Sequence, residues 1–447
     1  MYLEELRRLS SDPVPVALVG VGRMGRGIVD QISTMVGLRV RALADIDPER
    51  AVRAFTENGW DPDHVVFAES PDPAEDALRR GQAVVSPDAR LVAGLEGVHA
   101  VVESTGVPDL GAEVAAISIA RGHHTVMLNV EADAVIGPIL AERARLRGVV
   151  YTLAAGDQPG AIFEMAEWAR CLGFEIVCAG RGTVLYPDDH HSTPEKYAEI
   201  ANRNRMNPKM YNEFRDGTKS QLEMVAVSNV LRLPPARRGM HEPFCKWQDL
   251  GKVFSLRSDG GILEATGVVD MANAINSSGE YVHEDKVFPG VFVVVTSPHA
   301  GVRSSMASLF EPGFGGTAQQ WGPNWGLFRP YHLACVEVPM SIARAVVQGR
   351  PTGDLRGGMV AELVAVAKRD LSPGEELDGG GGYTVYGLSE RSEIARAENL
   401  LPFGFAYEGT RVKRPLARDQ ALRWDDVEPD TGSFLYRLRR EQDGLFK

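Results

Sequence analysis

Apolar and polar residues near the start of the chain follow the order that a strand, a helix and a second strand require. Val16 to Val19 is a continuous apolar run, typical of a parallel strand buried on both faces. The pattern Gly20-x-Gly22-x-x-Gly25 and a helical stretch come next, and a second apolar strand ends at Asp45. This order predicts the first half of a doubly wound α/β parallel sheet.

The same alternation of strand and helix patterns predicts where the domains begin and end. Strand-like GVHAVVESTG and HTVMLN follow within the first domain. Glycines, alternating apolar residues and little helical period predict a small all-β module at the end of the chain. We therefore expect four parts: a Rossmann domain (1–156), an α+β catalytic and dimerisation domain (157–335), a helix returning to the Rossmann domain (336–352) and a β module (353–447).

The glycine pattern carries the chemistry of a dinucleotide site. Gly20 allows the sharp turn, and Gly25 allows the helix to lie close to the strand. Gly22 has no side chain, so a pyrophosphate can approach the backbone at the helix N-terminus. Arg23 and Met24 complete the predicted phosphate-binding turn.

Asp45 stands where an acid accepts hydrogen bonds from the adenosine ribose. Its charge should repel a 2′-phosphate, which favours NAD over NADP. Arg23 and Arg50 could meet that phosphate if Asp45 swings aside, so the expected cofactor is NAD(P)H with the preference open.

Polar residues also follow the later strands of the first domain. Ser104, Thr105 and Gly106 end one strand and are expected to contact the cofactor. Asn129 and Glu131 end the next, where both could face nicotinamide and substrate. Glu131 is a candidate catalytic acid, and a capping role is the alternative.

The segment RDGTKSQLEMVAVSNVL supplies the main catalytic candidates. Asp216 is expected to cap a helix on which Lys219 and Glu223 share one face. In one interpretation the two acids orient Lys219 as the proton donor and acceptor for a substrate oxygen. In the other, Lys219 and Glu223 form an ordinary surface ion pair.

A second polar cluster, TSPHAGVRSSM, has the composition of an anion site. His299 and Arg303 can both donate to a phosphate. A divalent metal would suit a sugar-phosphate rearrangement, but no ligand pattern identifies one, so the metal is left unknown.

Composition narrows the function classes. The net charge of −12 argues against nucleic acid or an anionic membrane as a partner, and no apolar run is long enough to span a bilayer. The N-terminus lacks the apolar core of a secretory signal, and the 4 cysteines form no CxxC pair. A cytoplasmic enzyme with a small-molecule substrate, forming a homo-oligomer, is the expectation.

The C-terminal module contains a weak internal repeat. AKRDLSPGEELDGGGGYTVYG and TRVKRPLARDQALRWDDV share a Lys-Arg-x-Leu start. The run from Gly379 to Gly382 is expected to form a flexible loop.

Three resemblances refine this picture. VALVGVGRMG, VVESTG and HTVMLN resemble the cofactor domain of homoserine dehydrogenases, with Asp216 and Lys219 at that family's acid and lysine. The C-terminal segments resemble a SAF domain, a β-clip module. The combination, with NPKMYNEFRDGTK, is similar to the deoxyxylulose phosphate reductoisomerase-like family, DRL. One departure is that homoserine dehydrogenases carry a lysine directly after the asparagine that corresponds to Asn129, whereas this chain has Val130 and then Glu131.

The DRL resemblance implies an NAD(P)-dependent oxidoreductase that reduces or reductively isomerises a small phosphorylated or polyhydroxy carbonyl compound. The type reaction converts 1-deoxy-D-xylulose 5-phosphate to 2-C-methyl-D-erythritol 4-phosphate, a step of isoprenoid biosynthesis. The alternatives are a homoserine-type or other hydroxy-acid or polyol dehydrogenase, and a non-catalytic dinucleotide sensor.

Overall fold

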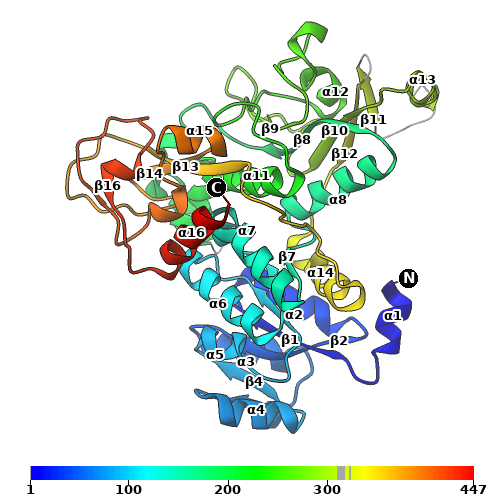
Figure 1. The fold of residues 1–447 in the computed structure, drawn as a ribbon, viewed down its shortest axis with the longest axis vertical. Helices are drawn as coiled ribbons and strands as arrows, with labels where there is room; N and C mark the ends of the chain where they lie inside the picture. The colour runs from blue at the N-terminus through cyan, green and yellow to red at the C-terminus, as the bar shows by residue number, and fades with distance from the viewer. Residues whose placement is uncertain (1, 205, 310–317, 322–323, 447) are drawn as a thin grey trace. The chain divides into compact units, whose positions relative to one another are not determined.

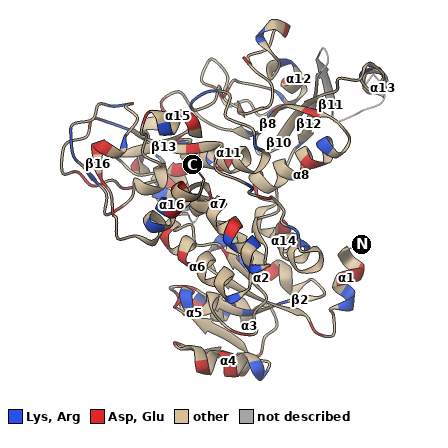
Figure 2. Cartoon of the chain, in the orientation of Figure 1, with Lys and Arg blue, Asp and Glu red and all other residues tan. Residues whose placement is uncertain are grey.

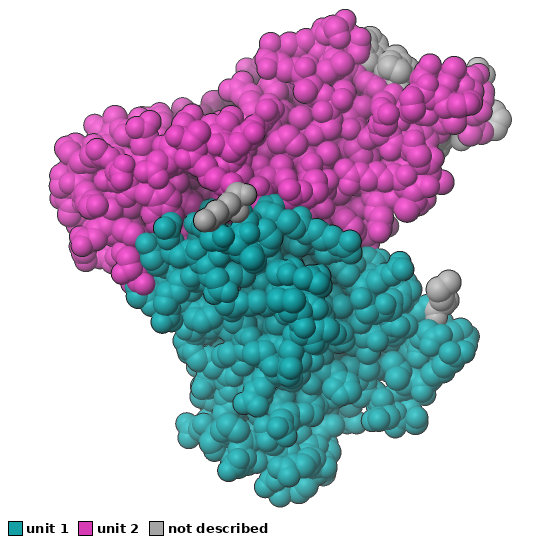
Figure 3. Space-filling view, viewed as in Figure 1, with its two compact units in different colours: residues 1–160, 333–358, 432–447 teal, residues 161–332, 359–431 magenta. Residues whose placement is uncertain are grey.

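The computed structural model describes residues 2–204, 206–309, 318–321 and 324–446. The chain forms two compact units, each assembled from separated segments (Figure 3). Unit 1 contains residues 1–160, 333–358 and 432–447, and unit 2 contains residues 161–332 and 359–431.

Unit 1 is built around a seven-stranded parallel sheet (Figure 1). Its strands are β1 (Val14–Val19), β2 (Leu38–Ala44), β3 (Val65–Phe67), β4 (Ala83–Ser86), β5 (Ala100–Glu103), β6 (His124–Met127) and β7 (Tyr151–Leu153). The order β3-β4-β2-β1-β5-β6-β7 reverses direction between β1 and β5. In doubly wound sheets, ligands bind outside the carboxyl ends of the strands at this reversal.

Helices cover both faces of this sheet. They are α1 (Tyr2–Arg8), α2 (Arg23–Ser33), α3 (Pro48–Thr56), α4 (Pro71–Arg79), α5 (Ala89–Ala93), α6 (Pro108–Arg121), α7 (Val130–Arg147), α14 (Ala334–Gln348) and α16 (Phe434–Leu445). Alternate residues of β1 face opposite cores: Val16 and Leu18 lie in one hydrophobic cluster, and Ala17 and Val19 lie in the other. The continuous apolar run therefore reflects burial on both sides, as predicted.

The C-terminal segment differs from the predicted domain boundaries. Residues 432–447 belong to unit 1, although the β module was expected to include them. The reason lies in α7, where Pro138 interrupts the helix. Gln442 of α16 accepts a hydrogen bond from Ile139 N at 3.0 Å and donates one to Val135 O at 2.9 Å, so its amide fills the interrupted ladder. Figure 1 draws α16 in red and α7 in cyan.

Unit 2 contains a five-stranded sheet of order β11-β12-β10-β8-β9 and the two-stranded sheets β13-β14 and β15-β16. The strands are β8 (Glu175–Thr183), β9 (Val268–Asn273), β10 (Val291–Thr296), β11 (Ala318–Trp321), β12 (Asn324–Arg329), β13 (Ala361–Ala367), β14 (Val385–Arg391), β15 (Arg411–Val412) and β16 (Val427–Glu428). Its helices are α9 (Ala198–Arg203), α10 (Pro208–Arg215), α11 (Thr218–Leu231), α12 (Leu250–Val253), α13 (Ala300–Leu309) and α15 (Ser392–Ala397), with α8 (Gln158–Cys171) beginning in unit 1.

Polar side chains of α11 bond the backbone of the two-stranded sheet β13-β14. Thr218 Oγ1 accepts from Gly387 N at 3.0 Å, and Gln221 Oε1 accepts from Ser389 N at 2.9 Å. At the other end of the helix, Asn229 Oδ1 accepts from Ala361 N at 3.0 Å. The β module is thus joined to α11 along the length of the helix.

The two copies of the internal repeat lie against one another. Leu371 N donates to Leu416 O at 2.9 Å, and Leu416 N donates to Leu371 O at 3.0 Å. These leucines occupy the same position in the two Lys-Arg-x-Leu sequences, so the repeat corresponds to a local symmetry of the module.

The glycine run from Gly379 to Gly382 is buried, which corrects the expected flexible loop. A side chain at Gly381 would collide with Lys209 O on α10. Asn212 of the same helix donates to Gly381 O at 2.9 Å. Glycine is needed here because two backbones approach closely.

Lys and Arg positions are interspersed with Asp and Glu positions along the chain (Figure 2). Among the helices that the structure describes, none combines the length and apolar character needed to cross a membrane.

Candidate functional site

The glycine turn of unit 1 has an open surface where a phosphate is expected. Gly20 has φ of +90°, and a side chain at Gly25 would collide with Gly20 O. At Gly22 an added Cβ would meet no atom within 4 Å. Two glycines are therefore required by the fold, whereas Gly22 borders free space at the N-terminus of α2, with Arg23 and Met24 exposed beside it.

Asp45 follows β2 and is linked to this turn. Its Oδ2 accepts a hydrogen bond from Val21 N at 2.7 Å, and its Oδ1 lies 3.3 Å from Arg50 Nη1. The carboxylate is only 7% exposed, whereas Arg50 is half-exposed. Asp45, the acid predicted to bind the ribose, thus lies directly beside the glycine turn. Arg50, the cation that could meet a 2′-phosphate, is paired with Asp45.

The polar residues after β5 contact the protein itself. Ser104 Oγ donates to Gly20 O at 2.8 Å, which ties the end of β5 to the glycine turn. Thr105 N donates to Glu103 Oε1 at 3.0 Å, and the Thr105 hydroxyl bonds the same carboxylate. Gly106 has φ of +70°. Ser104 and Thr105 therefore shape the turn with their side chains, and direct contact with a cofactor stays a prediction.

Two buried carboxyls near these strand ends were missed by the sequence analysis. Burial raises the pKa of Glu103, at the end of β5, to about 7, although hydrogen bonds from Thr105 oppose the shift. Burial likewise raises the pKa of Asp133 on α7 to about 6, and Tyr151 donates to it at 2.7 Å. The sequence signal was an acid inside an apolar strand, as in VVESTG.

The segment after β6 begins α7. Asn129 is the N-cap, since its Oδ1 accepts from Ala132 N at 3.1 Å while its Nδ2 donates to Val107 O at 3.1 Å. The contact of Asn129 with nicotinamide stays a prediction. Glu131 lies in the first turn of α7 and is 9% exposed. Val130, at the position of the homoserine dehydrogenase lysine, is buried.

Lys219 is the one residue of α11 that is not fully buried. Every other residue of this helix is buried, from Thr218 to Leu231, and Lys219 in the first turn is half-buried. The N-cap is Gly217 with φ of +85°, which corrects the expected N-cap Asp216. Asp216 still contributes, because its Oδ1 accepts from Thr218 N at 2.9 Å.

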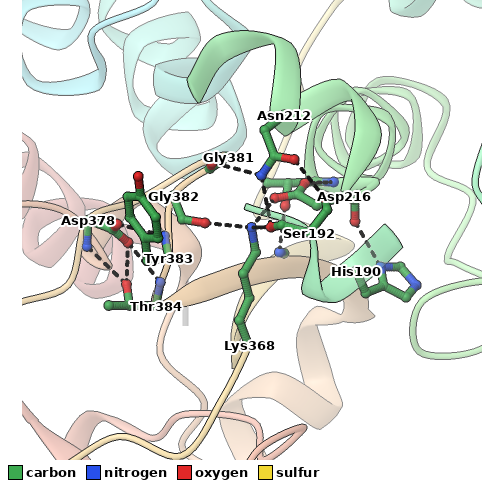
Figure 4. A network of polar contacts seen from close by, with 12 residues as sticks. His190, Ser192, Asn212, Asp216, Lys368, Asp378, Gly381, Gly382, Tyr383 and Thr384 are labelled. Atoms are coloured by element: carbon green, nitrogen blue, oxygen red, sulfur yellow. Dashed lines mark hydrogen bonds and ion pairs between the residues drawn. The ribbon is translucent and has the colours of Figure 1, made fainter. Parts of the chain in front are cut away.

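Asp216 forms a buried ion pair with Lys368, which the sequence analysis did not identify (Figure 4). Lys368 Nζ lies 2.7 Å from Asp216 Oδ2 and donates to Ser192 O at 3.0 Å and to Gly382 O at 2.8 Å. Burial raises the pKa of Asp216, and the charge of Lys368 opposes that shift. Asp216 therefore joins the β module to the start of α11, and its orientation of Lys219 stays a prediction.

Glu223 forms a buried ion pair with Arg181 of β8. The two side chains are 3% and 4% exposed. This contradicts the surface-pair interpretation, which required an exposed Glu223, and it gives Glu223 a cationic partner other than Lys219.

His299 lies just before α13, Arg303 lies in its first turn, and each bonds the protein itself. Arg303 Nη1 donates to Ser297 O at 2.7 Å, and His299 Nδ1 accepts from Val302 N at 3.4 Å. Their phosphate role stays a prediction. Within the described ranges, no three His, Cys, Asp or Glu side chains are grouped to hold a metal ion.

The candidate residues of α11 lie in a segment that matches a known family model. Residues 156–338 match the family model described as oxidoreductase DRL, catalytic domain. This match supports an NAD(P)-dependent oxidoreductase enzyme related to the DRL family. No curated protein matches the chain at a significant level.

Solved structures that match parts of the chain include inositol dehydrogenases and a reductoisomerase. Myo-inositol 2-dehydrogenase from Lactobacillus plantarum is 12% identical, with 76% of this chain and 91% of that chain covered and a TM-score of 0.37. The 1-deoxy-D-xylulose 5-phosphate reductoisomerase from Zymomonas mobilis, in complex with NADPH, is 17% identical, with coverage of 50% and 59% and a TM-score of 0.34. Apo scyllo-inositol dehydrogenase from Lactobacillus casei is 14% identical, with 42% of this chain covered and a TM-score of 0.29, and this chain spans about half of its length (48%).

Proposed function

We propose that this protein uses NAD(P)H to reduce, or reductively isomerise, a small phosphorylated or polyhydroxy carbonyl compound of the 1-deoxy-D-xylulose 5-phosphate type. The observation that carries the proposal is Lys219, the one half-buried residue on a helix that is otherwise buried throughout. It lies inside the segment that matches an oxidoreductase catalytic domain. Lys219 is thus the one side chain of α11 that solvent, and therefore a substrate, can reach.

The residues of unit 1 fit a nicotinamide dinucleotide. Gly22 leaves open space for a pyrophosphate, and Asp45 offers a buried carboxylate for the ribose hydroxyls. The neighbouring charge of Asp45 favours NAD(H), and Arg50 could serve NADP(H) if the pair between them opens.

The bound cofactor supplies the hydride, and this chain's residues supply position and protons. Lys219 donates a proton to the alkoxide oxygen that forms when the carbonyl carbon receives hydride. Asp216 and Glu223 fix the helix on which Lys219 stands through Lys368 and Arg181. Glu131 stays a candidate for substrate hydroxyls. The described residues show no metal-binding group, so no step is assigned to a metal.

Three finer features belong to the same proposal. The repeat that exchanges hydrogen bonds at Leu371 and Leu416 supports a SAF-like β-clip for the module. The buried Val130 disfavours a homoserine-type enzyme, because it replaces that family's lysine with an apolar core residue. Assembly as a homo-oligomer stays a prediction.

Lys219→Met tests the catalytic proposal. We expect kcat on the true substrate to fall by roughly a hundredfold or more, the usual scale for general acid–base catalysis. The melting temperature and the affinity for NAD(P)H should barely change, since methionine retains most of the aliphatic stem. Turnover is measured with a panel of sugar phosphates and hydroxy acids with both cofactors, with product skeletons identified by NMR.

Lys252→Met, at an exposed lysine of the same unit, is the matched control and should behave as wild type. Near-normal kcat for Lys219→Met would reject the proposed centre. An unrearranged product would indicate a simple dehydrogenase or reductase, and binding of NAD(P)H without turnover of any carbonyl would indicate a sensor.

A further inference from the structure

A loop that follows α11 holds a histidine against a buried carboxylate. Asp270 on β9 is fully buried, and its Oδ2 lies 2.6 Å from His241 Nδ1. Its Oδ1 accepts the backbone N–H groups of His241 at 2.8 Å and of Met271 at 2.9 Å. Both carboxylate oxygens are thus fixed, and they set the orientation of the imidazole ring.

The backbone around this histidine is unusual. Met240 has φ of 63° and Glu242 has φ of 49°, and Gly239 precedes them with φ of 72°. Residues other than glycine rarely adopt this left-handed conformation, which persists only where surrounding contacts impose it and which clusters at functional sites. Two such residues flank His241.

Contacts from α11 impose this conformation. Gln221 Nε2 donates to Gly239 O at 2.7 Å and to Glu242 Oε1 at 2.6 Å. Gln221 lies in the first turn of α11, two residues after Lys219 and on a different face of the helix. His241 and Asp270 lie within the matched catalytic segment.

The second ring nitrogen of His241 is available for chemistry. When Nδ1–H donates to Asp270, the neutral ring carries its lone pair on Nε2. The side chain is 15% exposed, and within the described part of the chain no hydrogen bond to Nε2 is present. Burial raises the pKa of the adjacent Glu242 to about 8, with Asp270 adding to the shift and Gln221 and Arg181 opposing it. That carboxyl therefore keeps its proton near neutral pH.

We propose that His241, oriented by Asp270, is the acid–base residue of an isomerisation step, and that Lys219 serves the reduction that follows. This inference rests on the proposed function. Two proton-transfer groups are needed because the isomerisation and the reduction each require one, whereas a simple reduction requires only a proton donor to the alkoxide.

The isomerisation balances without any other reactant. His241 Nε2 takes the proton of the hydroxyl on the carbon next to the ketone, and that C–O bond becomes a carbonyl. The substituent on this carbon migrates with its bonding pair to the ketone carbon, and the former ketone oxygen takes a proton back from Nε2. The product is a branched aldehyde, which the cofactor's hydride and a proton from Lys219 convert to the alcohol.

Two substrates separate the steps. The ketone 1-deoxy-D-xylulose 5-phosphate requires both, whereas its branched aldehyde isomer requires the reduction alone. For His241→Asn, which keeps an N–H donor for Asp270 but lacks Nε2, we expect kcat on the ketone to fall by about a hundredfold or more and kcat on the aldehyde to stay near wild type. Lys219→Met should lose activity on both.

His64→Asn is the matched control, because His64 is an exposed histidine 3.7 Å from Asp61 in unit 1. If His241→Asn has a lowered melting temperature, Asp270→Asn provides the second variant and should show the same selective loss. As a readout without cofactor, the ¹⁵Nε2 resonance of His241 should shift when the ketone is added to the wild-type protein.

Equal losses on both substrates, or no loss on either, would overturn the assignment, as would an unperturbed Nε2 resonance at saturating ketone. If the wild-type protein reduces the aldehyde but does not turn over the ketone, the reductase activity is supported and the isomerisation role of His241 is rejected. A wild-type protein inactive on both compounds would contradict the proposed function itself.

Discussion

The glycines around the first turn of unit 1 differ in whether the fold requires them. Gly25 is needed by the fold, because a side chain there would meet the backbone at Gly20. Gly22 has free space around it. The sequence pattern predicted both positions but could not separate them, since the distinction depends on which atoms lie nearby.

Gly22→Val should abolish NAD(P)H binding and leave the melting temperature nearly unchanged, because its side chain would enter ligand space rather than the core. A fluorescence titration and a thermal melt measure the two effects. Gly25→Ala is the contrasting control and should lower the melting temperature. Unchanged affinity in Gly22→Val would show that this turn does not bind the cofactor.

The raised pKa of Glu103 makes the stability of unit 1 depend on pH. The pKa rises from 4.5 to about 7 on folding, so the native carboxyl keeps a proton that the unfolded chain has lost. The stability that it contributes is complete below about pH 4.5 and is lost as the pH rises to about 7.

Glu103→Gln should remove this dependence. Between about pH 5 and about pH 8, wild type should lose roughly 2–3 kcal/mol more unfolding free energy than the variant, at about 1.4 kcal/mol per pKa unit. Urea unfolding at the two pH values measures the difference. Glu96→Gln, at an exposed carboxyl of the same unit, should show no such change, and parallel pH curves for wild type and Glu103→Gln would contradict the argument.

At the scale of elements, α11 both carries the catalytic candidate Lys219 and bonds the sheet β13-β14. Its hydrophobic periodicity is weak because nearly every face is buried, and the polar side chains that bond the sheet β13-β14 look in sequence like ordinary helix-surface residues. The parallel sheet of unit 1 was predictable because its strands are local apolar runs. The ion pairs of Asp216 and Glu223 were not, because Lys368 and Arg181 lie far from them in the sequence.

Lys368→Met should destabilise unit 2 by about 3–5 kcal/mol, since it leaves the Asp216 carboxylate buried without its cation. Urea unfolding measures the loss. The double variant with Asp216→Asn should recover part of it, because the uncompensated charge is removed. Lys413→Met, at the exposed equivalent position of the repeat, should be close to neutral, and a similar loss in both single variants would count against a special role for Lys368.

For the whole molecule, the main surprise is how the units share the chain. Unit 1 takes three separated segments and unit 2 takes two. The returning helix was recognisable from its apolar pattern, and the corresponding helix α14 belongs to unit 1. One of its contacts there is the hydrogen bond that Ser341 Oγ accepts from Ala155 N at 2.8 Å. The return of residues 432–447 had no comparable signal, because it depends on contacts between residues far apart in the sequence, such as Gln442 with α7 and Leu435 N with Asp109 Oδ1.

Gln442→Ala should lower the stability of unit 1 by about 1–3 kcal/mol, because the buried Ile139 N–H loses its hydrogen-bond partner. Val135 O keeps a longer hydrogen bond from Arg439 Nη1 at 3.4 Å. Hydrogen exchange should accelerate at the Ile139 amide. Arg440→Ala, on the exposed face of the same helix, is the control and should leave exchange unchanged. Unaltered protection of Ile139 in Gln442→Ala would show that the amide does not stabilise α7.

The interrupted ladder of α7 also affects how the protein is made. The ribosome must add 303 further residues after Ile139 before Gln442 exists, roughly 15 to 60 s at ordinary elongation rates. During that interval water or a chaperone must satisfy the two backbone groups in the nascent chain. Unit 1, although most of it is encoded first, therefore completes its native hydrogen bonding only after unit 2 has been synthesised.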